Sequence, residues 1–318
     1  MLKLALSKRR EFNMKNNPTV SVIINNYNYD CFLSEAINSA LNQTYSNTEI
    51  IVVDDGSTDN SRDIIAGYGD QIIPILKENG GQSSALNLGF AVSKGEIICF
   101  LDSDDAWHPQ KVECVAGAFD RYPNASVIYH KVQNVDKTGK PLNRPWPHKV
   151  VRGNIAQKVV NCGGWWPWPP TTGLSFSRKF LLQVMNIPEK EYRICADTYL
   201  ADLAPFFVNV VGIDQALSLM RLHGSNNWSN TIEAEKREIH YHEVRANRLN
   251  KFLKQSGFNI EIDLSKNLAY RSTKFNIGEE RDLIGLSLLN LLNPYDWRPH
   301  SRIKAAVNVW LTGFSKSR

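Results

Sequence analysis

The chain has 318 residues, enough to bury a large core in one big domain or two modest ones. Its 42% hydrophobic and 22% charged residues are ordinary for a soluble globular protein. The formal net charge of +5 is unevenly placed, with +4 in residues 1–18, −4 in residues 19–230 and +5 in residues 231–318. An acidic centre suits a metal ion better than a nucleic acid, so we expect no nucleic-acid partner.

Strands and helices are expected to alternate through the first hundred residues. Short apolar runs rich in β-branched residues predict buried strands, and apolar residues at helical spacing predict the helices between them. This β-α-β-α order gives a mainly parallel sheet covered by helices on both faces, an α/β fold. The predicted strands are 20–26, 49–55, 71–78 and 95–102, and the predicted helices are 30–43, 58–69 and 80–95.

Polar side chains follow each of these strands. In parallel sheets with helices on both faces, ligands bind at the carboxyl ends of the strands. Four separate polar clusters therefore converge on one predicted edge, which a single solvated acidic turn would not explain. They are Tyr27 and Asn28, Asp54 and Asp55, Asn79 to Gln82, and Asp102 with Asp104.

The chemistry of this edge suits a nucleoside diphosphate and a metal ion. The Asp55 carboxylate can accept hydrogen bonds from a base N–H group or a ribose hydroxyl. The glycine-rich start of the helix at 80–84 offers backbone N–H groups to an anion. Asp102 and Asp104 are hard oxygen ligands for Mg²⁺ or Mn²⁺, which needs only one or two carboxylates when it also bridges phosphate oxygens.

Several segments together resemble family 2 glycosyltransferases: "PTVSVIINNYNYDCFLSEAINSALNQTY", "EIIVVDDGSTDNS", "ENGGQSSALNLGFAVSKGEIICFLDSDD" and "HPQKV". The resemblance is strong over about 18–130 and continues more loosely to about 230. It implies a GT-A fold, with a Rossmann-like sheet, and transfer of a sugar from a nucleotide-sugar with inversion. It also implies a DxD metal motif at Asp102–Asp104, with Asp104 as the direct ligand and Mn²⁺ or Mg²⁺ as the cofactor. The residues that it assigns to the donor nucleotide are Asn25, Tyr27, Asp55, Asn87, Asp102 and Arg221.

The second half carries two further similarities. "CADTYLADLAPF" resembles the family's ED-x-x-L segment, which makes Asp197 the general base, although Ala196 replaces the preceding acid. "LSLMRLHGSNNWS" resembles the closing R-x-H-x-x-N segment, which places Arg221 over the diphosphate and His223 at the metal. Leu86 stands where many relatives carry an arginine, so one phosphate contact is missing.

Each of these residues has a simpler interpretation. Asp197 could cap a helix, because Asp is favoured before the first helical turn. A lone histidine such as His223 is more often structural, and Asp55 could merely organise a turn with Gly56. The acidic stretch is not a calcium loop, and "NGGQSS" is not a P-loop because no Gly-Lys-Ser follows.

The stretch "CGGWWPWPPTTG" at 162–173 is expected to be a loop, because its prolines exclude a helix or central strand. Aromatic rings stack on sugar rings, so an acceptor platform of Trp165, Trp166, Trp168 and Thr171 is one interpretation. A satellite core built from the tryptophans is the other.

We expect a basic tail at 1–17, a catalytic domain at 18–230 and a helical extension at 231–318. Within the catalytic domain, 18–105 would bind the nucleotide and 106–230 the acceptor. Near the end, Ile303, Val307, Trp310 and Phe314 share one helical face with basic neighbours. Such a helix can lie on a membrane or pack on the protein.

The chain start has no convincing signal peptide, and the 13-residue apolar run at 283–295 is too short to span a bilayer. We therefore expect a cytoplasmic protein, with contact at the inner membrane face through its basic termini. The five cysteines form no CxxC pair, which argues against a disulfide framework or a zinc cluster.

The expected reaction is a single displacement onto a glycan or lipid-linked acceptor, as in polysaccharide synthesis. One rival class is a sugar-phosphate nucleotidyltransferase, which would need a Gly- and Arg-containing loop where this chain has "NNYNYD". The other is an inactive carbohydrate-binding relative, against which the intact Asp104 and Asp197 argue.

Overall fold

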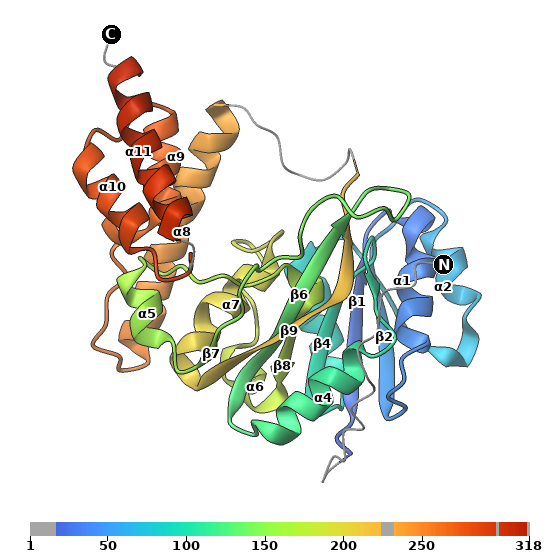
Figure 1. Ribbon diagram of the computed structural model, residues 1–318. Helices are drawn as coiled ribbons and strands as arrows, with labels where there is room; N and C mark the ends of the chain where they lie inside the picture. Colours follow the sequence, from blue (N-terminus) through green and yellow to red (C-terminus); the bar gives the residue numbers. More distant parts are fainter. Residues whose placement is uncertain (1–16, 224–231, 297–298, 317–318) are drawn as a thin grey trace. The chain divides into compact units, whose positions relative to one another are not determined.

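The computed structural model describes residues 17–223, 232–296 and 299–316 (Figure 1). These residues form two compact units. The first contains the described residues of Met1–Val150 together with Pro169–Asp197 and Val211–Arg221. The second contains Val151–Trp168, Thr198–Val210 and the described residues of Leu222–Arg318. Apart from its last residue, the predicted basic tail at 1–17 lies outside the described residues.

The first unit is built on one sheet, with strand order β3-β2-β1-β4-β8-β6-β9-β5. Its first four strands pair in parallel, as predicted, with Ile24 of β1 opposite Val52 of β2 and Leu101 of β4. They form because continuous apolar runs can be buried on both faces of a parallel sheet. The bounds are Val20–Asn26 (β1), Thr48–Asp55 (β2), Ile73–Lys77 (β3) and Ile97–Asp102 (β4).

The other side of the sheet is antiparallel, which the alternating order of the first hundred residues did not predict. Strand β8 runs antiparallel to both β4 and β6, and β5 runs antiparallel to β9. The result is a mixed sheet with a Rossmann-like half, so the predicted α/β class is confirmed. The bounds are Ala106–Trp107 (β5), Ala125–Val135 (β6), Leu174–Ser177 (β8) and Asn209–Arg221 (β9, which begins in the second unit).

Helices cover both faces of this sheet (Figure 1). One core joins alternate residues of β1, such as Val22 and Ile24, to apolar residues of α1, α2 and α4. On the opposite face, α3 packs so closely that a Cβ on Gly89 would lie 2.5 Å from the Ile23 side chain. The bounds are Asp30–Leu41 (α1), Ser61–Ala66 (α2), Gln82–Val92 (α3), Lys111–Arg121 (α4) and Arg178–Val184 (α6), with 3-10 turns at Gly69–Gln71 (η1) and Thr171–Gly173 (η2).

The second unit is mainly helical. Its charged helix α8 runs from Ile232 to Gln255 and is followed by Gly257, whose φ of 79° is typical of a glycine just after a helix end. The remaining elements are β7 (Arg152–Gly153), α5 (Ala156–Asn161), α7 (Ala196–Phe207, whose first two residues belong to the first unit), η3 (Leu264–Lys266), α9 (Leu268–Asn276), α10 (Leu283–Leu292) and α11 (Pro299–Lys316).

The predicted apolar face of α11 is exposed at the residues that the structure describes. Ile303, Val307 and Trp310 are exposed, whereas Ala306 and Val309 are the buried residues of this helix. The Phe314 side chain lies outside the described residues. Among the helices that the structure describes, none is long and apolar enough to cross a bilayer.

Candidate active site

Asp102, Asp104 and Asp105 crowd together at the carboxyl end of β4, as the sequence predicted. Burial and the negative charges of Asp104 and then Asp197 raise the pKa of Asp102 to about 7. Burial, Asp104 and Asp102 likewise raise the pKa of Asp105 well above its ordinary value. The crowding reaches Tyr29, whose pKa rises to about 12 through burial and the charge of Asp104. A cation among these groups would relieve their repulsion.

Two amides hold the Asp102 carboxylate. The side-chain N–H groups of Asn25 and Gln82 both donate to Asp102 Oδ1, each across 3.0 Å. Asn25 is thus beside the acidic turn, with its side-chain N–H group directed at Asp102, and its predicted contact with the nucleotide stays a prediction. Within the part of the chain that the structure describes, its own Oδ1 is buried without a hydrogen-bond partner. Gln82, the first residue of α3, was not among the predicted site residues.

Gln82 also reaches the helix that carries Asp197. Its side-chain oxygen accepts a 3.0 Å hydrogen bond from the backbone N–H of Ala196, the first residue of α7. Its backbone N–H donates to the Arg193 carbonyl across 2.7 Å. One side chain therefore bridges the end of β4 and the start of α7, which are far apart in the sequence.

Asp197 is the second residue of α7, in its first turn. Its Oδ2 accepts a 3.1 Å hydrogen bond from the backbone N–H of Thr171. Thr171 itself is buried, and its side-chain oxygen lies 3.4 Å from the Gln82 amide nitrogen. Its backbone N–H positions Asp197, and its predicted acceptor contact stays a prediction. Asp197 is half-buried and its charge is felt at Asp102, so both carboxylates belong to one site.

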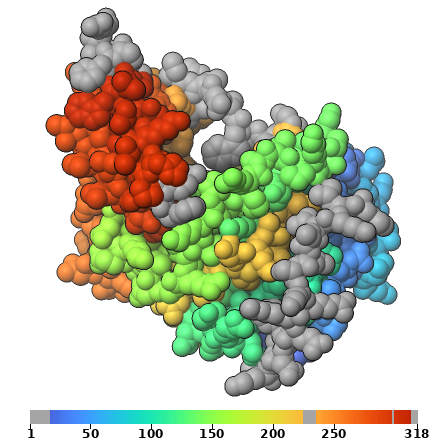
Figure 2. Space-filling model, in the orientation of Figure 1, coloured from blue at the N-terminus to red at the C-terminus, as the bar shows by residue number. Residues whose placement is uncertain are grey.

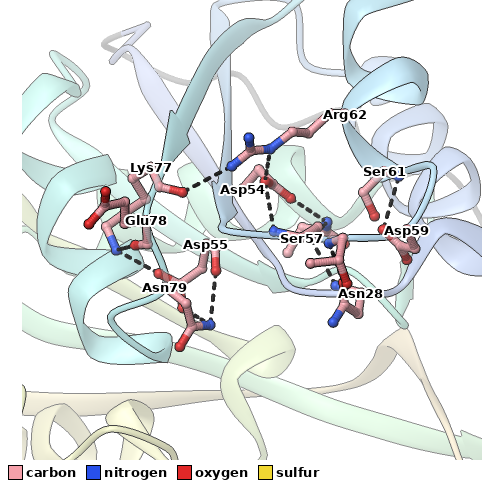
Figure 3. Close-up of polar contacts among 12 residues, drawn as sticks. Asn28, Asp54, Asp55, Ser57, Asp59, Ser61, Arg62, Lys77, Glu78 and Asn79 are labelled. Atoms are coloured by element: carbon pink, nitrogen blue, oxygen red, sulfur yellow. Dashed lines mark hydrogen bonds and ion pairs between the residues drawn. The ribbon is translucent and has the colours of Figure 1, made fainter.

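Asp55 is occupied by the protein itself. Its Oδ1 accepts from Lys77 Nζ at 2.6 Å and from the Gly80 N–H at 2.8 Å. Its Oδ2 accepts from the Asn79 amide at 3.0 Å and from the Gly81 N–H at 2.7 Å. Figure 3 shows Lys77 and Asn79 beside this carboxylate. In this structure the anion at the glycine-rich start of α3 is Asp55. The predicted contact of Asp55 with the nucleotide stays a prediction.

The turn that follows β2 is organised by Asp54, the neighbour of Asp55. The Asp54 carboxylate accepts from the Ser57 N–H at 3.1 Å, the Arg62 guanidinium at 2.9 Å and the Asn26 amide at 3.0 Å (Figure 3). These hydrogen bonds lower the pKa of Asp54 despite its burial. Tyr27, which directly follows β1, is 47% exposed and remains open to a ligand.

Two other residues that were predicted to contact the donor nucleotide, Asn87 and Arg221, direct their side chains into the protein. The Asn87 amide pairs with the backbone N–H and carbonyl of Ile187, at 2.8 and 2.9 Å, and so ties α3 to that segment. Arg221 is buried rather than presented to a phosphate. Its Nε and Nη1 donate to the carbonyls of Asp104 and Lys137, and its Nη2 pairs with Glu35 at 2.7 Å.

Arg221 thereby shapes the acidic turn. Besides its guanidinium contact with the Asp104 carbonyl, its backbone N–H donates to Asp105 Oδ1 across 3.0 Å. His223 follows two residues after the end of β9. Among the described residues, no three His, Cys, Asp or Glu side chains are grouped to hold a metal ion. The metal role of His223 stays a prediction. Two carboxylates still fit Mg²⁺ or Mn²⁺ when phosphate and water supply the other ligands.

The tryptophan-rich segment is a loop, as predicted, and its residues 162–168, which include the three tryptophans, belong to the second unit. Trp166 is fully buried and its indole N–H donates to the Ala201 carbonyl across 3.0 Å. It is therefore a core residue and cannot serve as a stacking face. Trp165 packs edge-to-face against Tyr295, with the ring centroids 5.3 Å apart. Trp165 and Trp168 are both half-buried.

Comparison with known proteins agrees with this fold. Residues 21–184 match the model for glycosyl transferase family 2. The chain belongs to this family. An uncharacterised glycosyltransferase of Nostoc sp. (strain PCC 7120) is 37% identical to this glycosyltransferase over 289 residues, which cover 87% of this chain and 89% of that one. Family membership argues against the nucleotidyltransferase alternative.

Solved structures show the same fold as this family 2 glycosyltransferase. Residues 1–349 of TarS from S. aureus, in complex with UDP-GlcNAc, align with a TM-score of 0.54 and 18% identity over 93% of this chain and 92% of that one. The mannosyltransferase PcManGT from Pyrobaculum calidifontis, in complex with GDP-Man and Mn²⁺, aligns with a TM-score of 0.52 and 16% identity. The alignment covers 96% of this chain and 89% of that one. The expected GT-A fold is thus confirmed.

Proposed function

We propose that this glycosyltransferase transfers a hexose from a nucleotide-sugar, with a UDP-sugar as the first candidate, to a hydroxyl of a glycan or lipid-linked acceptor. The setting would be polysaccharide or cell-surface glycan synthesis in the cytoplasm, at the inner face of the membrane. The observation that carries the proposal is the Gln82 bridge, which joins the Asp102 carboxylate to the helix start that bears Asp197. A carboxylate that can help to hold a metal ion and a candidate general base, close together at one edge of the sheet, suit the transfer of a sugar from a nucleoside diphosphate to a hydroxyl.

In the proposed reaction the acceptor hydroxyl donates a hydrogen bond to Asp197. As the hydroxyl oxygen bonds to the anomeric carbon, Asp197 takes the proton and the bond from that carbon to the diphosphate oxygen breaks. Attack opposite the leaving group inverts the anomeric carbon. General base catalysis of this kind contributes ~10²–10⁴-fold. Thr171 would keep the carboxylate aimed, through its backbone hydrogen bond to Oδ2.

Asp104, with Asp102 beside it, is the proposed holder of Mn²⁺ or Mg²⁺. A bound divalent ion would stabilise the charge that develops on the diphosphate leaving group. The support from this chain is the mutual repulsion of Asp102, Asp104 and Asp105, which a cation would relieve. We propose Tyr27 as a nucleotide contact because its side chain is exposed directly after β1, the strand that pairs in parallel with β4.

The test is a panel of nucleotide-sugars, with nucleoside diphosphate release measured in Mn²⁺, in Mg²⁺ and in EDTA. We expect one donor to be hydrolysed slowly with water as a surrogate acceptor, and Asp104→Asn to lose both turnover and nucleoside diphosphate affinity. Asp70→Asn, an exposed acid in the turn before β3, is the control and should be unchanged. Activity that survives EDTA and Asp104→Asn would overturn the metal role, and inactivity with every donor would favour a binding relative.

A further inference from the structure

Helix α10 exposes a continuous apolar stripe. Ile284, Leu288, Leu291 and Leu292 are all exposed, and their spacings of four, three and one place them on one side of the helix. Leu292 is the most accessible, at 72%. The buried side of α10 carries Leu286 and Ser287 instead. An amphipathic helix of a globular protein would present polar residues where α10 presents leucines.

Helix α11 repeats this pattern. Ile303, Val307, Trp310 and Leu311 are exposed, again at spacings of four, three and one, with Leu311 at 65%. Ala306 and Val309 are buried, and Val309 packs in a small core with Leu286 and Phe275. The exposed residues of α11 therefore lie away from the side on which the helix is held.

The two stripes face the same side of the helix pair. The helices are in contact, with Ser287 Oγ donating to the Ala306 carbonyl across 3.3 Å, and only residues 293–298 connect them, so they pack antiparallel. In each helix an exposed stripe residue directly follows the residue at this contact: Leu288 follows Ser287 and Val307 follows Ala306. Each step of one residue along an α-helix turns the side-chain direction by about 100° around the helix axis. In antiparallel helices the same rotation turns both stripes to one side.

The eight exposed residues thus form one apolar surface, which we call the hairpin face. Figure 2 shows the red C-terminal helices at the molecular surface. Scattered exposed leucines are normal, but a contiguous apolar patch of this kind marks an interaction site. The charge of this part of the sequence selects the partner: residues 283–318 contain five Lys and Arg and one acid, Asp296.

We propose that the hairpin face docks on the anionic surface of a lipid bilayer. Apolar side chains of an interfacial helix enter the boundary between headgroups and acyl chains, while nearby lysines and arginines are attracted to anionic headgroups. The aromatic ring of Trp310 suits this boundary. A second copy of the chain is a poorer fit, because two surfaces with the same net positive charge repel. The docking goes beyond the proposed transfer reaction and does not depend on it.

Vesicle sedimentation of the full chain, without nucleotide or acceptor, tests the proposal. The vesicles contain phosphatidylcholine with about a third phosphatidylglycerol, or phosphatidylcholine alone. We expect binding to the anionic vesicles and its weakening in high salt. The double variant Leu292→Gln with Leu311→Gln should bind at least ~10-fold more weakly, because it removes two leucine side chains from the apolar contact. Both leucines are exposed, so the variant should keep its melting temperature.

A matched control replaces two exposed leucines outside the hairpin face, Leu142→Gln with Leu182→Gln, and should bind as the wild type does. Three results would overturn the proposal. The wild type could ignore anionic vesicles at low salt, or the hairpin variant could bind them unchanged. Alternatively, the wild type could be a dimer by light scattering that the hairpin variant dissociates, without vesicle binding by either, which would assign the face to a second copy.

Discussion

The Gln82 side chain donates to Asp102 across 3.0 Å while its oxygen accepts from the start of α7. The amide is suited to this place because it offers a donor and an acceptor at once. Asp102 already lies near Asp104 and Asp197, whose charges raise its pKa. A neutral donor that satisfies Asp102 without adding charge keeps these carboxylates at one sheet edge.

Gln82→Ala should therefore lower kcat at least ~10-fold, because misplaced catalytic groups lose rate steeply. Gln82→Glu should be worse, since it replaces the donor with a further negative charge beside Asp102. The measurement is nucleoside diphosphate release with the best donor, together with the melting temperature. Gln183→Ala, on the exposed side of α6, is the control. Full activity in Gln82→Ala would show that the bridge has no role in the site.

Arg221 should matter more to the protein than its ion-pair partner. Arg221→Gln would leave the carbonyls of Asp104 and Lys137 without their donors, and we expect a loss of about 1–3 kcal/mol in unfolding free energy. Glu35→Gln removes only a partner that is 54% exposed, worth at most about 1 kcal/mol. Urea unfolding of both variants checks this. Equal losses would mean that the carbonyl contacts contribute nothing.

The buried His130 should make the protein sensitive to acid. Burial and then the Lys111 charge lower its pKa from 6.5 to about 3. Between these two values the unfolded chain binds a proton that the folded chain does not, so stability falls as the pH drops below 6.5. At pH 5 the loss is about 2 kcal/mol relative to pH 8. His130→Gln should lose this part of the pH dependence, as urea unfolding at the two pH values would reveal; an unchanged slope would contradict it.

In the second unit, Arg245 holds the buried Asp202 with two hydrogen bonds, one of them 2.8 Å long. Arg245→Gln should lower the unfolding free energy by about 3 kcal/mol, because it leaves a buried carboxylate unpaired. Lys266→Gln breaks the exposed pair with Asp263 and should change stability by less than about 1 kcal/mol. Similar effects in the two variants would argue against a buried pair. Asp202 is also a poor substitute for Asp197 as a base, because its carboxylate is already paired.

The sequence predicted the parallel half of the fold and the convergence of its polar residues. Apolar runs and helical spacing are local signals, and the carboxyl ends of parallel strands necessarily share an edge. The antiparallel pairing of β8 with β4 depends on contacts between residues about 80 positions apart, which no local pattern encodes.

Individual roles at the site were harder to predict. Residue type told us that Asp55 and Arg221 are charged, but the partners that occupy them come from Lys77, Asn79 and Glu35, which only the fold brings near. The sequence places Gln82 in one of the polar clusters at the ligand edge but gives it no individual role, because a glutamine beside two glycines has no catalytic signature. Its position as the first residue of the helix after β3, at the ligand edge, was the available signal. The roles predicted for the site residues, Tyr27, Asp55, Asp104, Asp197 and His223 among them, stay predictions.

A substitution at Asp197 distinguishes an active enzyme from a binding module most directly. Asp197→Asn retains an oxygen that can accept the hydrogen bond from the Thr171 N–H, so the local structure should persist. It removes only the capacity to take a proton. If Asp197 merely held that segment, the variant would keep its rate. As the general base its loss should lower kcat ~10²-fold or more, while nucleoside diphosphate affinity and melting temperature stay near the wild-type values. Transfer at an undiminished rate in Asp197→Asn would remove this residue from the mechanism.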